Sequence, residues 1–166
     1  MKSPDLTYDF ITKFHTSHPM ANPSISHIIC STTSNASINN ENILYPVINN
    51  NKKFLGQMPR IEKARKSVAS FKLRKGMEIT TKTTLRRQKI YSYIFYLINF
   101  VLPKFTQIPY FSINNLGNGA LGIGPSPIST HENGNIIIVL NNKFTRLEKI
   151  FILSYYSIPT ASKFTH

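Results

Sequence analysis

The stretch "KARKSVASFKLRKGMEITTKTTLR", residues 63–86, carries the clearest structural pattern in the sequence. Its first part, up to Gly76, carries six positive charges and no negative one. Residues 71–74 alternate between apolar and charged side chains, which is typical of a half-buried strand. A second alternating run follows at residues 78–86. We therefore expect a β-hairpin with Lys75 and Gly76 at the turn, where Gly76 supplies a positive φ.

Alternation along the two predicted strands divides their side chains between two faces. One face would be polar and holds Lys72, Arg74, Lys82, Thr84 and Arg86. The other face would be apolar and packed against helices, and it holds Phe71, Leu73 and Ile79. A merely solvated strand surface usually mixes both signs of charge, whereas this face has only one. We therefore favour a binding face over a solvated one.

The charge of the whole chain supports this interpretation. Its 166 residues carry a net charge of +13, with a pI near 10.0. Residues 52–89 contain 13 of the 20 Lys and Arg residues but only Glu62 and Glu78, so this window holds +11 of the total. Self-repulsion of this size weakens a compact state unless a polyanion neutralises it. Nucleic acid is the leading partner, and an anionic membrane surface is the second.

Upstream of the hairpin the sequence predicts a helix, a strand and a loose segment. "SPDLTYDFITKF" starts with Ser3 as N-cap and Pro4 in the first helical position, and we expect this helix to be ended by Pro19. Its apolar face would hold Leu6, Phe10 and Phe14. "PSISHIICST", residues 23–32, predicts a strand. Residues 34–53 are rich in Asn, which favours neither helix nor strand, so we expect a loose segment with some helix or loop.

Downstream of the hairpin, helical spacing returns twice. The first helix ends at Pro103, and its apolar face would hold Ile90, Tyr93, Ile94, Leu97, Ile98 and Val101. "NIIIVLNN", residues 135–142, predicts a short apolar strand. "TRLEKIFILSYY", residues 145–156, predicts a last helix, with Thr145 and Glu148 forming a capping box. We expect Leu147, Ile150, Phe151 and Tyr155 to share the packed side of that helix.

This order of elements predicts one α+β domain over residues 1–166. The sheet would be mostly antiparallel, with helices packed on one face and the basic surface on the other. The longest apolar run, residues 91–102, is far shorter than the roughly 20 residues that a bilayer requires. The first 20 residues resemble neither a secretory signal nor a transit peptide. We expect no membrane insertion.

The sequence lacks the constellations that carry enzyme chemistry. "GNGALG", residues 117–122, matches a dinucleotide-binding fingerprint, but Pro125 and Pro127 forbid the helix that must follow, so we expect a flexible loop. Cys30 is the only cysteine and predicts a small core residue. The histidines, His15, His18, His27, His131 and His166, show no metal-ligand spacing. We expect neither catalytic residues nor a metal or cofactor, so the chain is not expected to be an enzyme.

Residues 56–103 resemble the bacterial-type large-subunit ribosomal protein five. The resemblance rests on "GQMPRIEKARKSVASFKLRKG" at residues 56–76, "KTTLR" at 82–86 and "LINFVLP" at 97–103. These motifs are long, ordered and correctly spaced. More weakly, "NLGNGALGI" at residues 115–123 is similar to a shortened form of that family's glycine loop. In that family the protein binds 5S ribosomal RNA in the central protuberance.

The resemblance implies a scaffold role rather than catalysis. The sheet face would pack on ribosomal RNA, and a hairpin loop would reach the P-site tRNA. Neighbouring central-protuberance proteins and a small-subunit head protein would be further partners. The residues implied to bind ribosomal RNA are Gln57, Arg60, Lys63, Arg65, Lys66, Ser67, Lys82, Thr84, Arg86 and Arg87. The residues implied to lie on the tRNA side are Lys72, Arg74, Lys75 and Gly76.

The sequence departs from that family's pattern at three places. Ser31, Thr33 and Asn35 stand where the family carries an Asn and a glycine-rich turn. "TQIPYF", residues 106–111, replaces a Phe-Arg-Gly loop. "GPSPISTHENG", residues 124–134, shortens an acidic segment that the family directs toward the small subunit.

The bias toward Asn and Ile, with runs such as "INNNKK", indicates an AT-rich genome. Together with the shortened loops it predicts a ribosome of the mitochondrial matrix, with a plastid or a bacterial cytoplasm as alternatives. Two rival functions stay open. One is a non-ribosomal RNA-binding protein or RNA chaperone. The other is a nuclease, although the sequence offers no carboxylate cluster for Mg²⁺.

Overall fold

The computed structural model describes residues 4–16, 24–34, 44–104, 111–112, 120–129, 132–140, 145–158 and 160–161. The chain divides into two compact units built from interleaved segments. Unit 1 comprises Met1–Ile28, Arg86–Gly122 and Ile137–His166, and unit 2 comprises Ile29–Leu85 and Ile123–Ile136. Because both units draw on separated stretches of sequence, the single domain over residues 1–166 stays a prediction.

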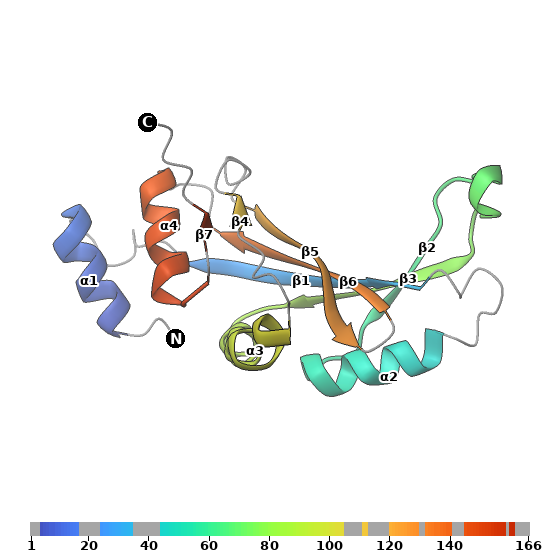
Figure 1. The fold of residues 1–166 in the computed structure, drawn as a ribbon, viewed down its shortest axis with the longest axis horizontal. Coiled ribbons are helices and arrows are strands. Elements are labelled where there is room, and N and C mark those ends of the chain that lie inside the picture. The colour runs from blue at the N-terminus through green and yellow to red at the C-terminus, as the bar shows by residue number, and fades with distance from the viewer. Residues whose placement is uncertain are drawn as a thin grey trace. The chain divides into compact units, whose positions relative to one another are not determined.

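A five-stranded sheet confirms the predicted α+β class, and each of its strands contributes residues to unit 2 (Figure 1). In order across the sheet its strands are β2 (Arg60–Lys63), β3 (Glu78–Leu85), β1 (Ile25–Thr33), β6 (Glu132–Leu140) and β5 (Ala120–Ser129). Strands β2 and β3 pair antiparallel. Strand β1 also runs antiparallel to β3, because Thr33 faces Thr80 while Ser34 bonds to Ile79. The strands predicted at residues 23–32 and 135–142 are both confirmed.

Helix α2 (Leu44–Leu55) covers one side of this sheet and is more regular than the loose segment with some helix or loop that was expected over residues 34–53. Residues 35–43 of that segment lie outside the described residues. Its buried side chains recur at helical spacing and include Val47, Ile48 and Leu55. Burial of this stripe outweighs the poor helix propensity of the Asn residues, most of which face solvent. Asn51 lies on the buried stripe and its amide bonds to the sheet, as described below. Gly56 ends the helix in the left-handed region, with φ of 61°.

The predicted hairpin exists, but its first strand lies earlier in the sequence than expected. Arg60 pairs with Lys82, and the register shifts at a bulge between Glu62 and Lys63. Residues 64–77 then form a long loop, so the strand predicted at residues 71–74 is wrong. The turn prediction is confirmed, because Met77 N donates to Arg74 O over 3.2 Å and Gly76 has φ of 94°. Alternation in sequence could not reveal that local hydrogen bonds within the loop replace strand pairing.

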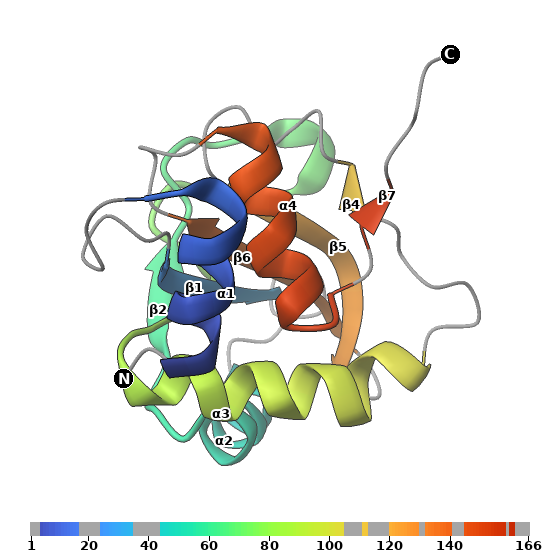
Figure 2. The ribbon, with the colours of Figure 1, turned by 90° about the vertical axis from the view of Figure 1, so that its left-hand side faces the viewer.

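In unit 1, helices α1 (Pro4–Phe14) and α4 (Arg146–Tyr155) lie side by side (Figures 1 and 2). Phe10, Phe14 and Phe151 form an aromatic cluster between them, with ring centroids 4.6–6.0 Å apart. Helix α1 is confirmed, although it ends at Phe14 rather than at Pro19. His15 has φ of 51° and donates its N–H to Ile11 O, which closes the helix.

The capping box of α4 is confirmed, and Thr145 N donates to Glu148 Oε2 over 2.6 Å. The predicted packed side of this helix is wrong in part. Ile152 and Leu153 are buried, whereas Leu147 is 69% exposed. Apolar residues lie almost all around this helix, so the sequence pattern alone could not choose the buried side.

Helix α3 (Gln88–Tyr96) also belongs to unit 1 and continues as a π-helical segment at Leu97–Val101. A 3-10 turn at Leu102–Lys104 follows and contains Pro103, which agrees with the predicted end. The predicted apolar face is confirmed, since Ile90, Ile94, Leu97 and Val101 are buried. Strands β4 (Phe111–Ser112) and β7 (Thr160–Ala161) pair in parallel as a separate two-stranded sheet.

The glycine-rich segment behaves differently from the expected flexible loop. Ala120 to Gly122 begin strand β5, while residues 117–119 lie outside the described residues. A strand rather than a helix follows, which fits the argument against a dinucleotide site. Cys30 is buried in β1, as predicted for a core residue. No helix within the described residues is long and apolar enough to cross a bilayer.

Candidate nucleic-acid interface

The basic window, residues 52–89, exposes its cationic side chains to solvent. All 13 of its Lys and Arg side chains are exposed: Lys52, Lys53, Arg60, Lys63, Arg65, Lys66, Lys72, Arg74, Lys75, Lys82, Arg86, Arg87 and Lys89. The last three belong to unit 1, and the other ten belong to unit 2. Unit 2 therefore presents a concentrated positive surface, which is the electrostatic signature of a nucleic-acid partner.

Strand β3 separates its polar side chains into a buried and an outer set. Thr81, Thr83 and Leu85 are buried toward the α2 side, whereas Lys82 is exposed and Thr84 is half-buried. The alternation predicted for this strand is therefore confirmed. The outer set supplies one charge and one hydroxyl at a spacing of two residues, about 7 Å along the strand. That spacing is close to the separation of neighbouring groups along an RNA backbone.

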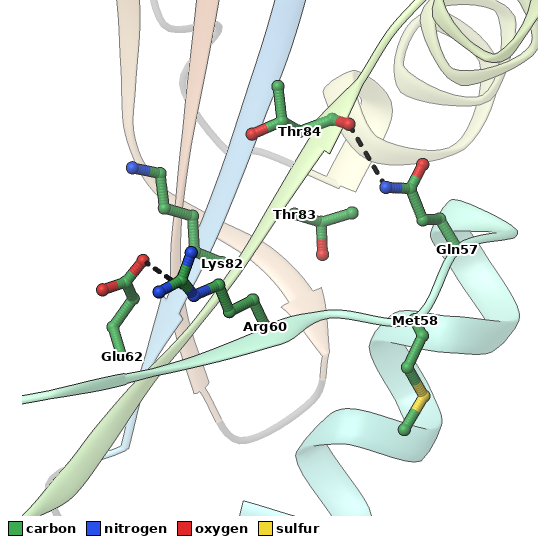
Figure 3. Close-up of a pocket in the computed structure, with 7 residues that line it drawn as sticks. All are labelled: Gln57, Met58, Arg60, Glu62, Lys82, Thr83 and Thr84. Carbon is green, nitrogen blue, oxygen red and sulfur yellow. Dashed lines mark hydrogen bonds and ion pairs between the residues drawn. The ribbon is translucent and has the colours of Figure 1, made fainter.

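A polar pocket of about 260 Å³ opens on this hairpin, entirely within unit 2 (Figure 3). It lies where the end of α2 leads into β2, beside β3. The residues that line it are Gln57, Met58, Arg60, Glu62, Lys82, Thr83 and Thr84. Four of these, Gln57, Arg60, Lys82 and Thr84, are sequence-predicted RNA-binding residues that the fold brings together.

Two cations face each other at the mouth of this pocket. Arg60 and Lys82 are directly paired across the antiparallel strands, and both side chains are exposed. Like charges in opposed positions destabilise a sheet. Glu62 offsets only part of this charge, because its Oε1 lies 4.0 Å from Arg60 Nε, on a largely exposed pair. An anion placed between the two cations would relieve the repulsion.

Gln57 forms the opposite wall of the pocket. The left-handed Gly56 turns the chain out of α2, so that Gln57 Nε2 donates to the carbonyl oxygen of Thr84 over 3.4 Å. Gln57 and Thr84 thus add an amide and a hydroxyl to the residues that line the pocket (Figure 3). Amides and hydroxyls of this kind contact riboses and base edges in RNA recognition.

The remaining predicted residues of unit 2 lie on the hairpin and its loop. Lys63 pairs with Glu78 across the strands, with Nζ 3.3 Å from Oε1. Lys75 N donates to Ser67 Oγ over 3.0 Å. This bond joins the residues predicted for ribosomal RNA to those predicted for the tRNA side within a single loop. Arg65 and Lys66 are exposed in the same loop.

Arg86 and Arg87 are not part of the pocket. They follow β3, are exposed and belong to unit 1, where Arg87 has φ of 56° just before α3. The sequence also missed three exposed or half-buried residues of the hairpin region: Met58, Glu62 and Phe71. Met58 stands next to Gln57 and Glu62 stands two residues after Arg60, and these positions in the sequence could have singled them out. Phe71 gave the opposite signal, because alternation predicted burial.

A buried polar network supports the hairpin from the α2 side. Asn51 Nδ2 donates to Thr32 Oγ1 over 3.2 Å and to Thr81 Oγ1 over 3.0 Å. All three residues are at most 3% exposed. The network ties α2 to β1 and β3, and it therefore fixes the strand that carries Lys82 and Thr84.

A second, apolar groove lies within unit 1. It is lined by Tyr91, Ile94, Phe95, Ile98, Tyr155, Tyr156 and Ser157. Burial raises the pKa of Tyr156, and the neighbouring hydroxyls of Tyr91 and Tyr155 raise it further. Tyr156 therefore stays neutral at physiological pH. Tyr93 of α3 is buried, as predicted for the apolar face of that helix.

The described residues contain no group of three or more His, Cys, Asp and Glu side chains that could hold a metal ion. The interface offers charged and polar side chains for binding. Its cations can bind phosphates, and its amide and hydroxyls can bind riboses or base edges.

Comparison with known proteins agrees with the resemblance seen in the sequence. No family model matches the chain. The large ribosomal subunit protein uL5 of Dictyoglomus thermophilum is 36% identical over 114 residues, which cover 67% of this chain and 64% of that protein. The uL5 of Desulforapulum autotrophicum is 38% identical over 109 residues, covering 64% and 61%. The uL5 of Xylella fastidiosa (strain 9a5c) is 39% identical over 116 residues, covering 68% and 65%.

The aligned part of the chain thus spans slightly less than two thirds of the length of these relatives. The three identities agree within a few per cent, and the shared name matches the motifs at residues 56–103. On this evidence the chain belongs to the family of large ribosomal subunit protein uL5.

Proposed function

We propose that this protein is a structural constituent of a large ribosomal subunit and binds ribosomal RNA through the hairpin of unit 2. The observation that carries the proposal is the exposed cross-strand pair Arg60 and Lys82 at the mouth of a polar pocket. An isolated protein gains nothing from two opposed cations. A phosphate between them would turn the repulsion into two charge-assisted hydrogen bonds.

The pocket and the loop would make different kinds of contact. Arg60 and Lys82 would bind a backbone phosphate, while Gln57 and Thr84 would reach a ribose or a base edge of the same strand. Lys63, Arg65, Lys66 and Ser67 would extend the phosphate contacts along the hairpin. Arg86 and Arg87 would add contacts from unit 1. The protein positions RNA in this scheme and catalyses no reaction.

The particular RNA and protein partners that we propose rest on the resemblance of residues 56–103 to the ribosomal protein family. The ribosomal RNA would include a 5S-type RNA of the central protuberance, and the loop with Lys72, Arg74, Lys75 and Gly76 would contact P-site tRNA. Neighbouring central-protuberance proteins and a small-subunit head protein would be protein partners. The Asn and Ile bias supports a mitochondrial ribosome, with a plastid or bacterial ribosome as alternatives.

The test is sedimentation of the tagged protein from its own cells through a high-salt sucrose gradient. We expect the wild-type protein in the large-subunit fractions. The double variant Arg60→Gln, Lys82→Gln should shift toward the top of the gradient. A matched control is Lys52→Gln, Lys53→Gln, which removes the same charge from the exposed end of α2.

Two results would contradict the proposal. If the wild-type protein left the large subunit at high salt but still bound free RNA, it would be a non-ribosomal RNA-binding protein or RNA chaperone. If the control variant were lost as readily as the pocket variant, the pocket would have no special role.

A further inference from the structure

Phe71 is 67% exposed, although the sequence pattern predicted that it packs against helices. It ends a 3-10 turn at Ala69–Phe71 in the long loop between β2 and β3. The loop lies at the far end of the hairpin from α2 (Figure 1). An exposed aromatic ring costs free energy in water. Its position at the end of the hairpin therefore calls for an explanation.

The loop holds this ring in place through its own hydrogen bonds. Val68 and Leu73 exchange two backbone bonds, of 3.0 and 3.1 Å, which pinch the residues between them into a closed turn. Phe71 N donates to Val68 O over 3.3 Å. Lys72 has φ of 54°, an uncommon conformation for a residue with a side chain. In the folded chain the loop is therefore held by its own bonds, and binding needs little further loss of loop entropy.

The base of the loop is closed as well. Ala64 N donates to Met77 O over 2.8 Å, and Gly76 N donates to Ala64 O over 2.9 Å. Lys75 N is bonded to Ser67 Oγ. These bonds continue the hairpin up to the turn that carries Phe71, so the ring sits on an ordered support.

The charges around the ring indicate what it meets. The residues of this loop, 64–77, include five exposed cations and no carboxylate: Arg65, Lys66, Lys72, Arg74 and Lys75. An apolar protein patch would have to desolvate these cations without neutralising them. Nucleic acid offers phosphates for the cations and a flat base for the ring at the same time.

We propose that Phe71 is a stacking platform for an exposed RNA base, held between cations that bind the adjoining phosphates. This inference rests on the proposed RNA-binding function and adds a specific contact to it. The base can belong to a tRNA or to an unpaired loop of ribosomal RNA. The two sources offer the same chemistry, so the experiment separates them.

Fluorescence gives a direct test because the chain contains no Trp. Phe71→Trp places a single indole at the proposed platform, and stacking on a base quenches its emission. The matched control is Phe54→Trp, an exposed position on α2 in the same unit. The probes are unfractionated tRNA, an RNA hairpin with an unpaired loop, a fully paired RNA duplex of equal length, and anionic lipid vesicles.

We expect tRNA or the hairpin to quench Phe71→Trp, the duplex to quench it much less, and Phe54→Trp to stay unchanged. Stronger quenching by one of the first two probes identifies the source of the base. Separate binding curves should show that Phe71→Leu binds that RNA about 5-fold or more weakly, while Phe71→Trp keeps the wild-type affinity. The side chain is exposed, so circular dichroism should be the same for all variants.

Three results would overturn the proposal. Binding of tRNA and hairpin without quenching would remove the stacking contact and leave the RNA-binding function standing. Quenching by anionic vesicles but by no RNA would assign the loop to a membrane surface. If the wild-type protein bound none of the three RNAs, the proposed function itself would fail.

Discussion

Lys82 and Lys63 lie on the same hairpin but differ in what surrounds them. Lys63 is paired with Glu78, whereas Lys82 faces Arg60 across the strands. Glu78 partly neutralises the charge of Lys63 within the protein. The like-charge pair of Lys82 and Arg60 would instead be stabilised by an anion from outside the protein. Position on the strand register, rather than charge alone, therefore separates a partly compensated cation, Lys63, from an uncompensated one, Lys82.

Replacement of these two lysines by Gln tests this distinction. Lys82→Gln should lower the slope of log K against log salt for RNA binding by about 0.7–0.9, the value for one lost phosphate contact. It should also leave the midpoint of thermal unfolding unchanged or slightly raised, because a like-charge pair is removed. Lys63→Gln should change the slope less, because part of its charge is already compensated. Equal slopes for the two variants would contradict this assignment.

Asn51 is the residue whose side chain matters most to the support of the interface. Its amide bonds two threonine hydroxyls that have no access to water. Asn51→Leu keeps the volume but leaves those hydroxyls without this donor, and should lower the free energy of unfolding by about 1–3 kcal/mol. Urea denaturation in a sulfate buffer measures the effect, since sulfate favours the folded state.

The neighbouring Asn50 supplies the control for that measurement, because it is exposed on the same helix. Asn50→Leu should change the free energy of unfolding by no more than about 0.5 kcal/mol. A similar loss in both variants would mean that helix propensity, and not the buried network, sets the stability of α2.

At the scale of elements, the loop between β2 and β3 combines a rigid backbone with uncompensated charge. The sequence predicted that Lys72, Arg74 and Lys75 flank a turn, and the structure confirms the turn at Gly76. It also shows that Lys72 occupies the left-handed region, where Asn is tolerated better than Ala. A charge-removing variant that keeps the loop shape is therefore Lys72→Asn, Arg74→Ala, Lys75→Ala.

We expect this triple variant to enter large subunits nearly as well as the wild type. It should weaken retention of P-site tRNA by about fivefold or less per lost contact, because exposed ion pairs are screened by salt. Filter binding of tRNA to purified ribosomes measures the effect. If the variant failed to enter large subunits, the loop would be an assembly contact on ribosomal RNA rather than a tRNA contact.

At the scale of the whole molecule, the distribution of charge limits how well the chain folds alone. The window of residues 52–89 holds +11 of the net +13, and every cation in it is exposed. Mutual repulsion of these charges acts against the compact state until counterions or RNA neutralise them. We therefore expect folding of this protein to be coupled to the binding of a polyanion.

The free protein should be partly disordered or poorly soluble at low salt. Addition of sulfate or of RNA should raise its helix content and its amide-exchange protection, because anions bound to the folded state stabilise it. Circular dichroism and hydrogen exchange at several salt concentrations test this expectation. A well-protected monomer whose stability is insensitive to salt would contradict an obligate RNA partner.

The sequence by itself determined the α+β class, the positions of α1, α3 and α4, and the strands β1, β3 and β6. Apolar periodicity and capping signals involve residues only a few positions apart, so they can be recognised in the sequence. The capping box of Thr145 and Glu148 is an example. It also identified the basic hairpin and the family, because the motifs at residues 56–103 are continuous. The sequence therefore predicted four of the residues that line the pocket: Gln57, Arg60, Lys82 and Thr84.

The tertiary structure alone decided what depends on partners distant in sequence. Burial of Val47 and Ile48 made a helix of an Asn-rich stretch, against its propensity. Tertiary packing buried Ile152 and Leu153 of α4 and left Leu147 exposed, a choice that the nearly continuous apolar surface of this helix left open. Bonds that close on Val68 turned Phe71 out to solvent, where alternation had predicted burial. Each of these three features depends on contacts that form only when the chain is folded. The local sequence pattern therefore could not predict them.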